Sequence, residues 1–258
     1  MYDQPVSPEQ REATLIVYDA MEAISGGHVE LALSLCRRAL ALHADLPDAL
    51  MMLADAECDD ADEFVERARE AVAAGRRDLG SEWFEQARGH FWGVHETRPF
   101  MRAMATLADA LMQLGSVRRI DEAIEIYEEM LDLNPGDNQG VRDVLALAYL
   151  QRVRYGEARA LLDRYPDDWL ATPAWSRVLL EYATGDEAAA AESLALARER
   201  NPSVEAYVSG RKRLPRSRPG YYSPGDETEA IVCAGVQRAA WKRHPKARAW
   251  LKAQGVDG

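Results

Sequence analysis

Several chemical signatures are scarce in this 258-residue chain. It has three cysteines, Cys36, Cys58 and Cys233, and no CxxC pair, so the sequence indicates neither a disulfide framework nor a zinc knuckle. We expect each cysteine to be a small buried apolar residue. No apolar run approaches the roughly 18 residues that span a bilayer, and the N-terminus lacks a basic region followed by an apolar run. We therefore expect a cytoplasmic protein with no signal peptide and no membrane contact.

Positive charge is also in short supply. The chain has 31 Lys and Arg against 43 Asp and Glu, a formal net charge of −12. Binding to a phosphate backbone depends on neutralisation by Lys and Arg, so the overall charge argues against general nucleic-acid binding. A local basic patch would be an exception.

Catalytic and cofactor motifs are missing as well. There is no GxSxG, no Walker loop and no Gly-rich dinucleotide turn. His90 and His95 are five residues apart with Gly93 between them, a spacing that does not place two imidazoles on one helix face. We expect no enzyme activity, no cofactor and no metal site. A pocket built by the less regular segments remains an enzymatic alternative.

What the chain does have is helical periodicity. It is rich in Ala, Leu, Glu and Arg, all good helix formers, while only 8% of its residues are aromatic. Small residues recur on one helix face, and Ala123, Ala158 and Ala190 lie about one 34-residue period apart. The same small, bulky, small spacing occurs earlier at Ala32, Cys36 and Ala39. This pattern predicts stacked helix pairs.

The clearest unit is the stretch 101–138, MRAMATLADALMQLGSVRRIDEAIEIYEEMLDLNPGDN. Two amphipathic patterns flank a turn, and Asn134-Pro135-Gly136-Asp137 closes the unit. The first helix of the chain also has clear ends. Ser7 can cap it, with Pro8 in the first turn, and Gly26-Gly27 ends it.

The pattern fails in two places. Residues 81–92 predict one extra helix, capped by Ser81, that has no partner in the repeat order. After residue 202, a short helix at 203–208 leads into a loop rich in Gly, Pro and Arg, followed by closing helices at 226–243 and 246–252. We therefore predict helical repeats over residues 1–202 and a C-terminal capping segment over 203–258.

The recurring helix pairs resemble tetratricopeptide repeats (TPRs) over roughly residues 10–202. The strings ETRPFMRA, LNPGDNQGVR, NPSVEAYVSGRKRLP and YYSPGDETEA are similar to those of a bacterial TPR subgroup without an assigned activity. This subgroup is distantly similar to the eukaryotic suppression-of-tumorigenicity proteins. The resemblance implies an all-α solenoid of about five helix pairs, with one extra helix and a C-terminal helical cap. It also implies a scaffold or adaptor that binds a protein or peptide, of unspecified identity, on a concave surface.

In such repeats the first helix of each pair lines the groove. The residues that we expect at or near this lining are Arg102, Asp109, Asn138, Arg142 and Arg177. Stacked arginines can grip a partner's carboxylates through charge-assisted bonds. The alternative is that they pair with nearby acids such as Asp109 or Asp143. The carboxylate clamp of chaperone-binding TPRs needs Lys and Asn where this chain has Ala105 and Asp109, which argues against a heat-shock chaperone as the partner.

A basic segment after the repeats is the second candidate site. Its positive residues are Arg211, Lys212, Arg213, Arg216 and Arg218. The segment could bind an anionic ligand or nucleic acid and make the chain a regulatory module. It could equally fold back on the acidic repeats as a strap, with Tyr221 and Tyr222 helping to dock it. Oligomeric state is left open.

Overall fold

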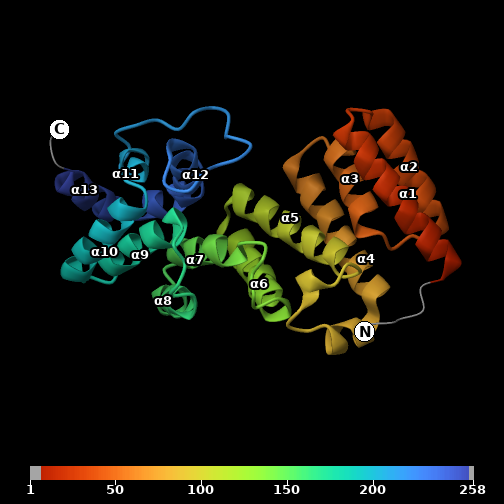
Figure 1. The fold of residues 1–258 in the computed structure, drawn as a ribbon, viewed down its shortest axis with the longest axis horizontal. Helices are drawn as coiled ribbons and strands as arrows, with labels where there is room; N and C mark the ends of the chain where they lie inside the picture. The colour runs from red at the N-terminus through yellow and green to blue at the C-terminus, as the bar shows by residue number, and fades with distance from the viewer. Residues whose placement is uncertain (1–6, 256–258) are drawn as a thin grey trace. The chain divides into compact units, whose positions relative to one another are not determined.

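The computed structural model describes residues 7–255, and this part of the chain contains helices and no β-strand. The chain divides into two compact units, unit 1 (Met1–Val141) and unit 2 (Arg142–Gly258). Figure 1 draws the helices in chain order from red to blue. The prediction of an all-α protein made of helix pairs is confirmed. Residues 1–6, on which the expected absence of a signal peptide partly depends, lie outside the described residues.

Unit 1 contains three successive helix pairs. Its helices are α1 (Pro8–Ser25), α2 (Val29–Leu42), α3 (Pro47–Glu57), α4 (Ala61–Gln86), the 3-10 helix η1 (Phe91–Gly93), α5 (Arg98–Leu114) and α6 (Val117–Leu133). The predicted start of α1 is confirmed, because the Ser7 hydroxyl accepts a hydrogen bond from the Gln10 amide at 3.1 Å. Gly26 ends the helix, as the sequence predicts.

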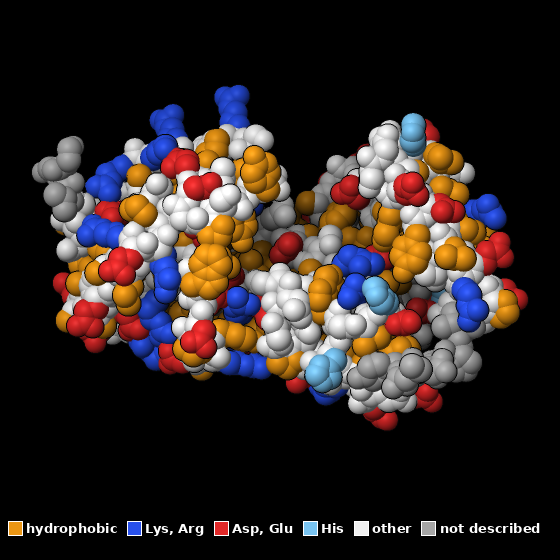
Figure 2. All heavy atoms as spheres, viewed as in Figure 1, with side chains coloured by type: hydrophobic (Ala, Val, Ile, Leu, Met, Phe, Trp, Pro, Cys, Tyr) orange, Lys and Arg blue, Asp and Glu red, His pale blue; other side chains and the backbone are white. Residues whose placement is uncertain are grey.

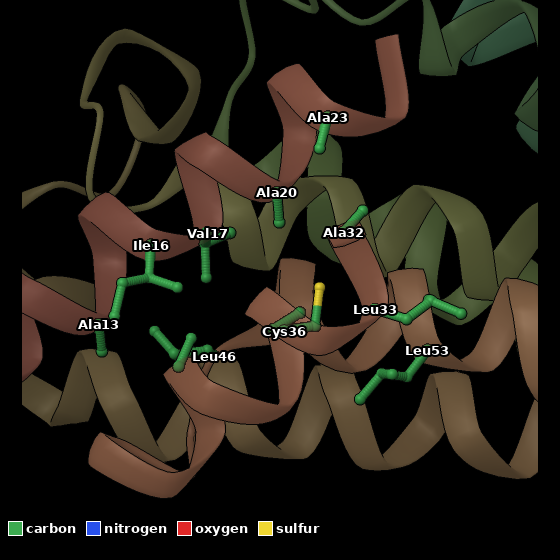
Figure 3. Packing of buried hydrophobic residues seen from close by; sticks show 12 residues of the cluster. Ala13, Ile16, Val17, Ala20, Ala23, Ala32, Leu33, Cys36, Leu46 and Leu53 are labelled. Atoms are coloured by element: carbon green, nitrogen blue, oxygen red, sulfur yellow. The ribbon is translucent and has the colours of Figure 1, made fainter. Parts of the chain in front are cut away.

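Small residues let the first helices of unit 1 approach closely. Ala13 and Ala20 of α1 and Ala32 and Cys36 of α2 are all fully buried. Figure 3 shows the side chains of Ala20 and Cys36 turned toward each other, and Leu46, at the start of α3, belongs to the same cluster. The small, bulky, small spacing of α2 therefore marks its core face, as expected.

The extra helix predicted at 81–92 is present but shorter. Gly80 adopts a positive φ of 63°, which kinks α4 and separates residues 81–86 from the rest of the helix. The helical segment ends at Gln86, and Gly89 (φ 88°) reverses the chain before η1. Phe84 and Phe91 pack against Phe100 of α5 with centroid separations of 5.5 and 6.4 Å. The segment therefore folds back onto the third helix pair.

Unit 2 contains two helix pairs and three further helices. They are α7 (Val141–Gln151), α8 (Tyr155–Arg164), α9 (Ala171–Ala183), α10 (Glu187–Arg200), α11 (Ser203–Val208), α12 (Glu227–Arg243) and α13 (Pro245–Gln254). The predicted short helix and both closing helices are found within two residues of their expected limits. None of the helices in residues 7–255 combines the length and apolar composition needed to cross a bilayer.

Buried polar groups attach α12 to the repeat helices. The carboxylate of Glu229 accepts hydrogen bonds from the amide of Ala171, at the start of α9, and from Nδ2 of Asn201, at 3.1 and 3.0 Å. The amide of Gln237 donates to the Thr172 carbonyl and accepts from the Trp241 indole, both at 2.9 Å. These contacts attach α12 to the last repeat helices, and the capping role of the closing helices stays a prediction. The domain boundary at residue 202 remains a prediction, since α11–α13 share one compact unit with α7–α10.

Candidate functional site

A cavity of about 420 Å³ opens between α1, the start of α3 and the segment that precedes α5. We call it the unit 1 groove. Its apolar lining comes from Leu15, Tyr18, Leu46, Pro47 and Trp83. Leu15 and Tyr18 leave 58% and 51% of their surface exposed, unlike the buried residues on the opposite face of α1. The groove therefore presents a hydrophobic surface to solvent; Figure 2 shows such orange side chains among charged ones on the visible face.

A polar network holds one wall of the groove. The Asp78 carboxylate lies 2.6 Å from Nε2 of His43 and accepts a hydrogen bond from Nε2 of Gln10 at 2.7 Å. Burial raises the pKa of Asp78, and its hydrogen bond with His43 opposes that shift. The three residues belong to α1, to the end of α2 and to α4, so the network fixes these elements relative to one another.

The segment before α5 supplies further lining residues. His95 and Glu96 are exposed at the edge of the groove. Thr97 is buried and donates to the Val94 carbonyl at 3.1 Å, and the Arg98 guanidinium donates to the Trp92 carbonyl at 2.9 Å. These bonds hold the segment in place and present His95 and Glu96 to the groove.

Comparisons with known proteins agree with this helix-pair architecture. Residues 116–179, which run from α6 into α9, match the family model of the tetratricopeptide repeat. The chain contains tetratricopeptide repeats. Its TPR fold is similar to the crystal structure of YrrB, described as a TPR protein with an unusual peptide-binding site. The two are 15% identical, the match covers 71% of this chain and 84% of YrrB, and the TM-score is 0.53.

A second solved structure is similar over a comparable length. It belongs to Pseudomonas aeruginosa pilF, at 19% identity, with 75% of this chain and 93% of pilF covered and a TM-score of 0.36. No curated protein sequence gives a significant match. The TPR fold is that of protein-interaction scaffolds. In unit 1 the first helices of the three pairs are α1, α3 and α5, and all three contribute residues to the groove.

The predicted groove residues of unit 1 have structural partners. Arg102 forms a bidentate ion pair with Asp48, and its Nε lies 2.9 Å from Oδ1. Asp48 lines the groove, whereas Arg102 does not and contacts the groove only through this carboxylate. Asp109 accepts a hydrogen bond from the Tyr127 hydroxyl at 2.5 Å and thereby joins α5 to α6. Asn138 lies in the turn after α6 and accepts a hydrogen bond from Asn134 at 3.4 Å. None of the three lines the unit 1 groove.

The predicted arginines of unit 2 are also ion-paired. Arg142 of α7 binds Asp168 at 2.6 Å, and Arg177 of α9 binds Asp163 at 2.6 Å. The alternative interpretation is that these arginines pair with nearby acids. Their observed contacts, with Asp168 and Asp163, are of this kind. Partner binding by Arg142 and Arg177 stays a prediction.

The basic segment follows α11. Arg211 pairs with Glu205 at 2.7 Å, and Lys212 pairs with Glu227. Glu205 belongs to α11 and Glu227 to α12, so the segment is attached to the helices on either side of it. Tyr221 and Tyr222 leave 81% and 43% of their surface exposed, and their role in docking the segment stays a prediction. The remaining cations of the segment are Arg213, Arg216 and Arg218.

The cysteines behave as buried apolar residues in two cases out of three. Burial raises the pKa of Cys36 to about 11 and that of Cys233 to about 12, so neither provides a thiolate nucleophile near neutral pH. Cys58 is partly exposed. Residues 7–255 contain no group of three or more His, Cys, Asp or Glu side chains arranged to hold a metal ion.

Proposed function

We propose that this protein is a non-catalytic adaptor whose unit 1 groove binds a peptide segment of a protein partner through an apolar anchor residue. The observation that carries the proposal is the pair Leu15 and Tyr18, which stand exposed on α1 above an apolar lining. An exposed apolar surface rimmed by polar groups is typical of an interaction site. The peptide-binding site in the description of YrrB supports looking for such a role here.

The charges at the rim favour a peptide with polar residues beside its anchor. Arg11 and Glu96 are exposed at the rim and form no ion pair within residues 7–255. Asp48 and Asp78 are already engaged by Arg102 and by the pair His43 and Gln10. Arg11 and Glu96 are thus available to opposite charges on a ligand, while the engaged acids keep the groove in shape.

The test is a selection of peptides from a displayed library on the full-length protein, followed by affinity measurements on variants. Tyr18→Ser and Leu15→Ser should each weaken the selected peptides at least tenfold, because an apolar anchor loses its contacts. Leu31→Ser is the matched control, since Leu31 is also exposed, at 53%, on α2 outside the groove lining. Equal affinity of wild type and the two groove variants would refute the groove as the binding site.

A further inference from the structure

Unit 2 has a second cavity whose chemistry is opposite to that of the groove. It measures about 510 Å³ and lies between α11, the basic segment, α12 and α13. Five cationic side chains line it, namely Lys212, Arg213, Arg238, Lys242 and Arg248, and none of its lining residues in the described part of the chain is acidic. Its volume falls within the range of small-molecule sites.

Four of these cations are not neutralised. Lys212 is paired with Glu227, whereas Arg213, Arg238, Lys242 and Arg248 form no ion pair with any residue in 7–255. By contrast, Arg102 and Arg177 of the repeat helices each form an ion pair with a carboxylate. A group of uncompensated cations in a chain of net charge −12 is therefore a local departure from the charge pattern of the molecule.

Repulsion between the unpaired cations of the cavity lowers the stability of the free protein. Arg238 and Lys242 are four residues apart on α12, so they face the same side and repel each other. Figure 2 shows Lys and Arg side chains standing out from the surface where Figure 1 draws the loop between α11 and α12, next to this pair of helices. A bound anion would remove this repulsion.

Arg248 is held ready at the cavity by the backbone. Its Nε donates to the Val208 carbonyl at 3.2 Å and its Nη2 to the Ser209 carbonyl at 3.3 Å. Gly210 permits this approach, since a Cβ there would lie 2.3 Å from the guanidinium, and its φ of +83° also favours glycine. Two carbonyls fix the side chain without cancelling its charge, so Arg248 keeps its positive charge beside the cavity.

We propose that this cavity binds a small organic molecule that carries a phosphate or diphosphate group. Arginine forks and a lysine suit the several oxygens and multiple charge of a phosphoryl group better than a single carboxylate. Val208, Leu214 and Trp241 supply apolar lining for the organic part. Three of the four cations without a carboxylate partner come from α12 and α13, outside the basic segment itself.

The test is calorimetric titration of the full-length protein with inorganic pyrophosphate and with ATP at constant ionic strength. The double variant Arg238→Gln, Lys242→Gln should lose affinity by at least tenfold, because two charge-assisted contacts disappear. Both residues are exposed on α12, so the fold should persist, as circular dichroism would show. The control Arg200→Gln, Lys246→Gln removes the same charge from exposed positions of unit 2 outside the cavity lining.

Retained affinity in the control, with loss in the cavity variant, supports the proposal. Two results overturn it. One is the absence of binding to either phosphate compound, or equal binding by wild type and the cavity variant. The other is tighter binding to a single-stranded oligonucleotide than to ATP, with an affinity that falls steeply with salt, which indicates a nucleic-acid surface instead.

Discussion

Gly75→Ala is the most direct test of how unit 1 sets the geometry of its groove. Gly75 is a buried residue inside α4, and a Cβ at this position would lie 2.7 Å from Cγ of Pro47 and 3.1 Å from Cδ2 of Phe100. Carbon atoms in contact prefer about 3.5–4.0 Å. Pro47 begins α3 and Phe100 lies in the first turn of α5, so the added methyl group must push one of these helices away from α4.

Two opposing effects determine the outcome. Ala is favoured over Gly inside a helix by about 1 kcal/mol. Overpacking a close-packed site costs about 1–3 kcal/mol. We therefore expect Gly75→Ala to lower the free energy of unfolding of unit 1 by up to about 2 kcal/mol. It should also weaken peptide binding, because Pro47 lines the groove.

Gly156→Ala is the matched control. Gly156 lies in α8, and nothing within 4 Å would meet a Cβ there, so only the gain in helix propensity applies. Urea denaturation followed by circular dichroism should show Gly156→Ala stabilised and Gly75→Ala less stable than it by about 1–3 kcal/mol. If Gly75→Ala is stabilised as much as Gly156→Ala, the close approach of α4 to α3 and α5 is not present in solution.

Three further predictions concern other sites. Ellman's reagent at pH 8 should modify Cys58 alone in the folded protein, because Cys36 and Cys233 are buried. After denaturation it should modify all three thiols. Fast labelling of Cys36 or Cys233 in the folded protein would contradict their burial. Asp168→Ala should destabilise unit 2 by about 2–3 kcal/mol in urea titrations, because it removes both the ion pair with Arg142 and the hydrogen bond from the Leu170 amide. An unchanged midpoint would contradict this. Burial raises the pKa of Asp109 above its unfolded value, so its ionisation costs stability as the pH rises through that range. The stability of Asp109→Asn relative to wild type should therefore increase from about pH 3 to pH 7, and a decrease over this interval would refute the sign.

The sequence was sufficient to predict the helices because their signals are local. The cap at Ser7 and the short helix at 203–208 depend on residues within a few positions of one another. The extra helix was predicted too long because its end depends on Gly89, whose positive φ is a property of the folded turn. Helical periodicity alone gave no sign of that turn.

The candidate sites were harder to predict because their residues come from distant parts of the chain. Asp78 meets Gln10 across 68 positions, and neither side chain has a feature that marks it as a partner of the other. The basic segment was identified from its composition, whereas Arg238 and Lys242 lie on α12, where the sequence has no comparable run of basic residues. Their spacing of four was the available signal, and it became informative only once α12 was placed beside the segment.

The buried carboxylate of Glu229 has a consequence for biosynthesis. The first amide of α9 and the side chain of Asn201 depend on an acceptor that is translated 58 and 28 residues after them, respectively. While the ribosome is still adding those residues, α9 has emerged without the group that completes its N-terminus. Unit 1 has all its own contacts by then and can fold first, whereas unit 2 reaches its final structure only after α12 has been made.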